Sequence, residues 1–203
     1  IACGTYSEAV VFASLVAGID GHEILVPALS VESSTKALLS AGLRPVPTDV
    51  DPETGNLATR NLTDAAGTQT GAIFVTHTFG HPAAISELTG LAANSNLVVI
   101  EDISESLGAR HLGTSVGGFG EVSVLGLGPG HLLTGGEGSE GGIVFVNVDR
   151  AEEVRHDRTV NGSAPSDLSV RIALSELRTA RRSLETRQVA AWHLTYELRG
   201  IRG

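Results

Sequence analysis

A single histidine stands in a glycine-rich stretch near the middle of the chain. The stretch is GPGHLLTGGEG, residues 128–138, and its histidine is His131. An imidazole titrates near neutral pH, so it can accept or release a proton during a reaction. Such a base acts only where other groups hold a substrate beside it, and two further stretches could supply those groups.

The two stretches are a Gly-Thr pair near the N-terminus and a strand-end carboxylate. Gly4 and Thr5 precede a helical pattern, and Asp102 ends the apolar run LVVIED at 97–102. A glycine-threonine turn before a helix can bind an anion, because the backbone is accessible and the helix N-terminus presents N–H groups. A carboxylate at a strand end can ionise beside a cation such as a protonated ring nitrogen. Ordinary helix capping is the structural alternative for both.

The elements that must position these residues alternate between strand-like and helix-like patterns. Short apolar runs predict six strands, at 23–26, 44–50, 72–78, 97–102, 122–127 and 142–148. Helical spacing predicts helices at about 6–18, 32–41, 59–66 and 84–95, and one long helix at 167–198. This order predicts an α/β fold of three layers, with a mostly parallel central sheet and helices on both faces.

In such a sheet, ligands bind at the carboxyl ends of the strands. We therefore expect four stretches to meet at one edge. They are CGTYSE at 3–8, ALSVESS at 28–34, IEDISES at 100–106 and the loop that carries His131.

The composition excludes several classes of protein. A chain of 203 residues with 41% hydrophobic residues can form one domain with a sizeable core. A formal net charge of −9 argues against nucleic acid as a partner, and the apolar runs are too short to span a membrane. The only cysteine, Cys3, excludes an internal disulfide and favours a cytoplasmic location. The chain begins at Ile1 without a methionine, which indicates a truncated N-terminus.

Two other polar stretches are interpreted as structural. His77 and His81 are four residues apart, but THTFGH follows a strand and forms a turn, so the two imidazoles are not aligned as on a helix and no metal site is expected. The stretch GGEGSEGG favours a flexible turn before the strand at 142–148 over an anion-binding loop.

Over roughly residues 2–198 the chain resembles the DegT/StrS family of sugar aminotransferases. The stretches that carry the resemblance are, in order, GHEILVPALS, LRPVPTDVDPETGNL, THTFGHPAAI, VVIEDISESLGAR, VGGFGEVSVLGL and TGGEG. The resemblance implies that residues 1–203 form a single domain, the large domain of a fold-type-I vitamin B6 enzyme. The family's first helix and its small C-terminal domain would then be missing.

The resemblance also implies roles for particular residues. Asp102 would pair with the pyridine nitrogen of the cofactor, and Gly4 and Thr5 would bind its phosphate. Val31 stands where the family stacks an aromatic residue on the cofactor ring, and Glu105 stands where it prefers histidine or glutamine. The family's two-fold assembly further implies a homodimer.

His131 occupies the position of the family's Schiff-base lysine. The only lysine, Lys36, falls inside a predicted helix and is expected to face solvent. Transamination needs a lysine amine, both as imine and as proton carrier, whereas a histidine serves only the second task. The sugar 3-dehydratase branch of the family has histidine here, in the pattern P-x-H-x-x-T-x-G-E-G. The matching residues are Pro129, His131, Thr134, Gly136, Glu137 and Gly138.

Several departures from the family weaken the expectation that a cofactor binds. The phosphate-binding serine is replaced by Gly126, the asparagine after the lysine position by Leu132, and a partner-subunit asparagine by Ala164. Two functions therefore stay open. One is a nucleotide-sugar enzyme of the 3-dehydratase kind, with pyridoxal or pyridoxamine phosphate held noncovalently and His131 as base. The other is a cofactor-less paralogue that acts as a binding or partner protein; a true sugar aminotransferase is less favoured.

Overall fold

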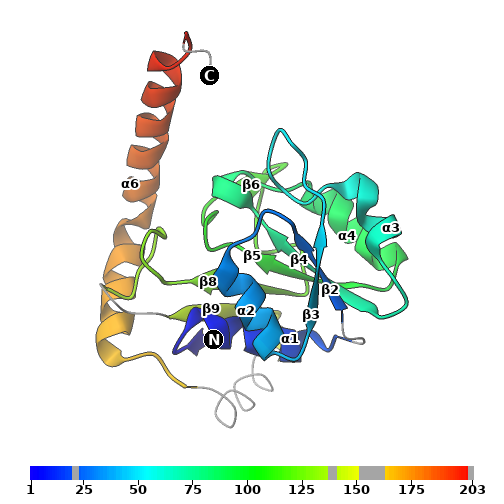
Figure 1. Cartoon of the computed structure of the whole chain (residues 1–203). Helices are drawn as coiled ribbons and strands as arrows, with labels where there is room; N and C mark the ends of the chain where they lie inside the picture. Colours follow the sequence, from blue (N-terminus) through cyan, green and yellow to red (C-terminus); the bar gives the residue numbers. More distant parts are fainter. Residues whose placement is uncertain (20–22, 137–140, 151–162, 201–203) are drawn as a thin grey trace.

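A seven-stranded sheet forms the centre of the molecule in the computed structural model, which describes residues 1–19, 23–136, 141–150 and 163–200 (Figure 1). The strand order is β1-β9-β8-β5-β4-β2-β3. The strands are β1 (Ala2–Cys3), β2 (Glu23–Pro27), β3 (Arg44–Thr48), β4 (Thr70–Thr76), β5 (Val98–Asp102), β8 (Val122–Gly126) and β9 (Gly142–Val146). The pairs from β3 to β8 are parallel, and β9 and β1 add two antiparallel pairings at one edge. The expected mostly parallel α/β sheet is confirmed.

Helices cover both faces of the sheet. The helices α1 (Tyr6–Ala17) and α2 (Glu32–Ser40) lie on one face, and η1 (Thr59–Asn61), α3 (Leu62–Ala65) and α4 (Ile85–Asn94) belong to the other. Two further single turns are η2 (Thr78–Gly80) and η3 (Val148–Arg150). The ends of α1 are where the sequence pattern predicts. Thr5 is its N-cap, and Gly18, in the left-handed conformation, is its C-cap.

The two faces divide the core by the period-two alternation of the strands. Ile24, Phe74 and Ile100 pack under α1 and α2, whereas their neighbours Ile73 and Val99 pack under α4. On β5 this alternation continues to the end of the strand. Glu101 therefore lies on the α4 face and Asp102 on the α1 face.

Some elements were not expected. The two-residue strand β1 pairs with β9, and β6 (Arg110–His111) pairs with β7 (Thr114–Ser115) in a separate small hairpin. Pattern reasoning misses such strands because two residues are too few to show a period. The edge strand β3 ends at Thr48, earlier than the expected 50, and it contains two prolines, which central strands exclude.

The long helix α6 (Asp167–Glu197) leaves the body of the molecule, and its C-terminal part extends beyond the sheet (Figure 1). Its N-terminal part packs beneath the loop that follows β8, where Ala173 and Ala180 contact a cluster containing Leu127 and Leu133. Large apolar side chains further along α6, such as Trp192 at 66% exposure, face solvent. Within the described ranges, no helix combines the length and apolar character needed to cross a lipid bilayer.

Candidate functional site

A cavity of about 200 Å³ lies at the carboxyl edge of the sheet. Residues from α1, β4, β5, α2 and the loop after β8 line it, so all four stretches expected to meet at this edge do meet. Its lining residues are Tyr6, Leu29, Ser30, Val31, Ser33, Thr76, His77, Thr78, Phe79, Asp102, Ser104, Glu105 and His131. Hydroxyl groups predominate among the polar ones, and this described lining contains no lysine or arginine.

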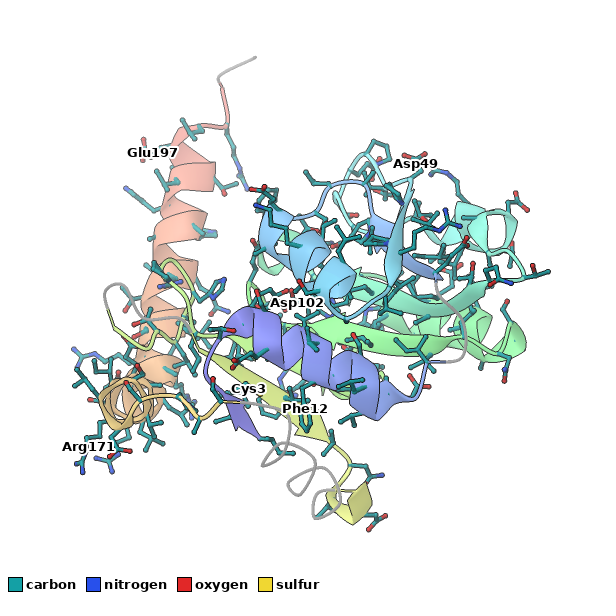
Figure 2. The ribbon with its side chains drawn as sticks, turned by 60° about the horizontal axis from the view of Figure 1, so that its bottom comes forward. Cys3, Phe12, Asp49, Asp102, Arg171 and Glu197 are labelled. Carbon is teal, nitrogen blue, oxygen red and sulfur yellow. The ribbon has the colours of Figure 1, made fainter. Side chains whose placement is uncertain are left out.

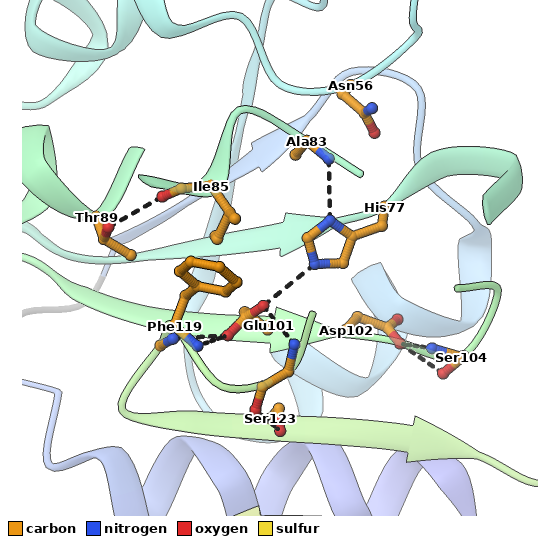
Figure 3. A network of polar contacts seen from close by, with 12 residues as sticks. Asn56, His77, Ala83, Ile85, Thr89, Glu101, Asp102, Ser104, Phe119 and Ser123 are labelled. Atoms are coloured by element: carbon orange, nitrogen blue, oxygen red, sulfur yellow. Dashed lines mark hydrogen bonds and ion pairs between the residues drawn. The ribbon is translucent and has the colours of Figure 1, made fainter. Parts of the chain in front are cut away.

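Asp102 lines the cavity and lies on the α1 side of the sheet (Figure 2). Both of its carboxylate oxygens already have partners. Oδ1 accepts from the backbone N–H of Ser104 at 2.9 Å and from the Ser104 hydroxyl (Figure 3), and Oδ2 accepts from the Tyr6 hydroxyl at 2.7 Å. The Ser104 oxygen in turn accepts from the N–H of Gly126 at 2.8 Å.

Tyr6, the first residue of α1, connects the two helices of this face with β5. Its hydroxyl lies 2.8 Å from the hydroxyl of buried Ser34 on α2. The same hydroxyl donates a hydrogen bond to Asp102 at the end of β5. Burial, followed by the negative charge of Asp102, raises the pKa of Tyr6 well above its usual value of 10.0. The phenol therefore stays protonated at neutral pH and donates a hydrogen bond to Asp102.

His131 reaches the same cavity from the loop after β8. Its Nδ1 lies 3.0 Å from the carbonyl oxygen of Gly126. Because a carbonyl only accepts, Nδ1 must carry the proton, and Nε2 is the basic nitrogen of the neutral ring. The loop is tied to α6, since both the N–H and the hydroxyl of Thr134 donate to Glu176. Glu137 and Gly138, the last members of the histidine pattern, lie outside the described residues.

The Gly4–Thr5 turn has the geometry of a helix N-cap. The Thr5 side chain accepts from the N–H of Glu8 at 3.0 Å, and the Glu8 carboxylate accepts from the N–H of Thr5 at 3.3 Å. Glu8 also accepts from the Ser163 hydroxyl, and the N–H of Gly4 donates to the Ser163 carbonyl at 3.0 Å. A carboxylate of the chain itself thus occupies the N-terminus of α1.

The other two predicted cofactor residues lie at the rim of the cavity. Val31 is the N-cap residue of α2 and is 49% exposed. Glu105 is exposed, and its Oε2 accepts from the backbone N–H of Phe79 at 2.9 Å. Lys36 lies on the solvent side of α2, 2.7 Å from Glu32, which confirms that the only lysine faces away from the cavity.

A second polar cluster lies on the opposite face of β5, and sequence reasoning missed it (Figure 3). The buried Glu101 carboxylate accepts from the backbone N–H groups of Gly117, Phe119 and Gly120 at 2.6–2.7 Å. Its fourth donor is Nε2 of His77 at 3.2 Å. The His77 Nδ1 accepts from the N–H of Ala83 at 3.0 Å, so His77 is a neutral donor and not half of an ion pair.

Burial raises the pKa of Glu101, but the hydrogen bonds from His77 and from the three backbone N–H groups outweigh it. The pKa is therefore held below its usual value of 4.5. His81, four residues from His77, is exposed and does not join this cluster. Among the described residues, no group of three His, Cys, Asp or Glu side chains could hold a metal ion.

The residues present do not fit the cofactor that the resemblance implies. Asp102, which is expected to pair with the pyridine nitrogen, already accepts hydrogen bonds from Tyr6 and Ser104. The N-terminus of α1, which is expected to bind the phosphate, is occupied by the Glu8 carboxylate. Gly126, in place of a phosphate-binding serine, has no space for a side chain, because a Cβ there would lie 2.9 Å from His131 Cε1 and 3.1 Å from Tyr6 Cδ2. The cofactor roles of Gly4, Thr5, Val31, Asp102 and Glu105 stay predictions.

Tyr6 is the most important residue that the sequence analysis did not name. A signal existed, because a bulky aromatic residue follows directly after a Gly-Thr turn, where a ligand would approach the backbone. Asp102 and His131, predicted from separate stretches, do line one cavity.

Known proteins resemble this chain in both sequence and fold. The model of the DegT/DnrJ/EryC1/StrS aminotransferase family matches residues 1–167. The GDP-perosamine synthase of Escherichia coli O157:H7 is 35% identical over 136 residues, which are 66% of this chain and 36% of that protein. The chain thus spans about a third of that relative.

Two solved structures share the fold. DesV of S. venezuelae, in complex with a ketimine intermediate, superposes with a TM-score of 0.90 at 24% identity, covering 100% of this chain and 58% of its own. The E. coli GDP-4-keto-6-deoxy-D-mannose-3-dehydratase with bound hydrated PLP superposes with a TM-score of 0.82 at 20% identity, and the match covers 98% of this chain and 60% of the dehydratase chain. Given the family match over most of its length, the chain belongs to the DegT/DnrJ/EryC1/StrS aminotransferase family.

Proposed function

We propose that the cavity beside Asp102 binds the sugar part of a nucleotide-linked sugar, or a related polyhydroxylated small molecule, without pyridoxal or pyridoxamine phosphate. The protein is then a binding or partner protein derived from sugar-modifying enzymes. The observation that carries this proposal is the Tyr6 hydroxyl on Asp102 Oδ2 at 2.7 Å, because it takes the contact that a cofactor ring would need.

The chemistry of the lining supports a neutral, hydroxyl-rich ligand. Serine and threonine hydroxyls both donate and accept hydrogen bonds, and the exposed Glu105 carboxylate can accept them from sugar hydroxyls. Because the described lining contains two carboxylates and neither lysine nor arginine, it disfavours phosphate. The nucleotide phosphates would then lie outside this cavity.

Isothermal titration of the wild-type protein with a 4-keto-6-deoxy nucleotide sugar, and separately with pyridoxamine phosphate, tests the proposal. We expect saturable binding of the sugar and none of pyridoxamine phosphate. The free nucleoside diphosphate is the control, since it lacks the sugar ring and should bind at least about tenfold more weakly. Tight binding of pyridoxamine phosphate to the wild type, or equal binding of the control, contradicts the proposal.

The second candidate is an enzyme of the 3-dehydratase kind, with His131 as base and the cofactor held noncovalently. The position of the His131 ring favours it, because Nδ1 is fixed on the Gly126 carbonyl and Nε2 is left to accept a proton in the cavity that also contains Asp102. In that case His131→Asn loses turnover of a 4-keto-6-deoxy nucleotide sugar by about 100-fold or more. Wild-type protein without turnover excludes this candidate.

A homodimer in the cytoplasm is part of the proposal. Several large apolar side chains of α6 are exposed, among them Val189 and Trp192, and a second subunit could cover them. Light scattering at micromolar concentration should give twice the mass of the chain. A monomer would contradict this part of the proposal without affecting ligand binding.

A further inference from the structure

One side chain spans the distance between the two ends of the expected cofactor site. Tyr6 directly follows the Gly4–Thr5 turn, where the phosphate is expected, and its hydroxyl reaches Asp102, where the ring nitrogen is expected. A phenol O–H donating to a carboxylate resembles the N–H of a pyridinium donating to the same oxygen. The tyrosine thus makes, from within the chain, the polar contact that the cofactor ring would make.

The environment of Tyr6 is built around its ring. Gly126 has no side chain, and a Cβ at that position would lie 3.1 Å from Tyr6 Cδ2 and 2.9 Å from His131 Cε1, both closer than ordinary contacts. The absence of a side chain at position 126 therefore makes room for the two rings. On its other side, the Tyr6 hydroxyl contacts the hydroxyl of Ser34, which has no exposed surface.

The phosphate end is closed by a separate set of contacts. The Glu8 carboxylate accepts from the N–H of Thr5 and from the Ser163 hydroxyl, which donates at 2.7–2.9 Å. A phosphate group would bring a second negative charge to this place. Repulsion between like charges at such a distance opposes its binding.

We infer that Tyr6 is a built-in occupant of the cofactor's ring position, held by Asp102 and Ser34 and accommodated by Gly126. The inference rests on the proposed function in one respect, that the wild-type chain uses no B6 cofactor. It adds that removal of one side chain reopens the position, because Asp102 is still placed at the end of β5 to receive a ring nitrogen.

The test compares the binding of pyridoxamine, which has the ring but no phosphate for Glu8 to repel, by the wild type and by Tyr6→Ala. Pyridoxamine has no aldehyde, so it forms no imine with Lys36 or the N-terminus and reports the noncovalent ring position alone. We expect no saturable binding by the wild type at millimolar ligand. Tyr6→Ala should bind with a dissociation constant at least about tenfold lower, and the double variant Tyr6→Ala/Asp102→Asn should lose this gain.

Tyr196→Ala is the matched control, because Tyr196 is the only other tyrosine and lies exposed on α6. It should bind like the wild type. A folded Tyr6→Ala protein that binds no better than the wild type overturns the inference, as does tight binding by the wild type. Sugar binding by the wild type is a separate measurement, so failure of the proposed function is distinguishable from failure of this inference.

A second measurement leaves Tyr6 itself in place. In protein with ¹³C-labelled tyrosine Cζ, the two tyrosines give two signals, and Tyr196→Phe assigns them. Asp102→Asn should shift the Tyr6 signal and leave that of Tyr196 unchanged. A Tyr6 signal that does not respond to Asp102→Asn shows that the phenol is not on Asp102, and the inference is then wrong.

Discussion

Glu101 and Asp102 are consecutive residues at the end of the same strand, yet their surroundings differ. Glu101 is fully buried on the α4 face, and three of its four donors are backbone N–H groups of residues 117–120. Asp102 is 6% exposed on the α1 face, and two of its three donors are side-chain hydroxyls next to a cavity. The first carboxylate fixes the course of the chain, whereas the second has partners that a ligand or a mutation can replace.

The difference follows from what each carboxylate would leave behind. Without Glu101, buried His77 and three partly buried backbone N–H groups lose the acceptor that they share. Without Asp102, the Tyr6 and Ser104 hydroxyls can turn toward water in the cavity. We therefore expect the free energy of unfolding to depend strongly on Glu101, and ligand binding in the cavity to depend on Asp102 and Tyr6.

The largest effect is expected for Glu101→Ala. It removes the fully buried acceptor that four donors share, so the free energy of unfolding should fall by about 3–5 kcal/mol. Urea denaturation measures this value. The control is Glu32→Ala, which removes an exposed partner of Lys36 and should change stability by less than about 0.5 kcal/mol. Equal effects of the two substitutions would remove the distinction between a structural and a replaceable carboxylate.

Acid should produce a smaller loss from the same cluster. The folded-state pKa of Glu101 lies below 4.5, so its contribution to the free energy of unfolding is present above about pH 4.5 and is lost as the pH falls through the folded value. Urea denaturation between pH 3 and pH 6 should show a steeper decline for the wild type than for Glu101→Gln. Parallel curves would show that Glu101 does not carry this acid sensitivity.

On the α1 face, Tyr6→Phe should cost about 1–3 kcal/mol, because the hydrogen bonds of the hydroxyl to Asp102 and to Ser34 are lost, whereas Asp102 keeps those from Ser104. The pH dependence has the opposite direction to that of Glu101. The folded-state pKa of Tyr6 is raised, so its contribution is fully present below about pH 10 and is lost as the pH rises through the folded value. Raising the pH from 8 to 10.5 should therefore lower the free energy of unfolding more for the wild type than for Tyr6→Phe, which urea denaturation at the two pH values measures.

The smallest effect on stability is expected for His131→Asn. The imidazole is partly exposed and its one described hydrogen bond is with the Gly126 carbonyl, so the melting temperature should change by no more than about 2 °C. Differential scanning calorimetry measures this shift. A loss as large as that for Glu101→Ala would place His131 among the structural residues and leave the cavity without its base.

Several features follow from the sequence itself because they depend on neighbours along the chain. The alternation of apolar runs and helical patterns determined the α/β order, and a period of two placed Glu101 and Asp102 on opposite faces of β5. Thr5 and Gly18 determined the ends of α1. The glycine-rich loop placed His131 at the carboxyl edge, and the single lysine lies on the outside of α2, beside Glu32.

Only the tertiary structure decided which polar groups contact one another. Asp102 and Tyr6 are 96 positions apart, and Glu101 joins a loop that begins 16 residues later to a histidine 24 residues earlier. No local period encodes such pairs. They arise because parallel strands and their crossover helices bring distant segments to one edge, where each buried polar group takes the partner that lies within reach. The sequence thus identified Asp102 as a candidate, but the fold placed a tyrosine of the same chain, Tyr6, as the hydrogen-bond donor to its carboxylate.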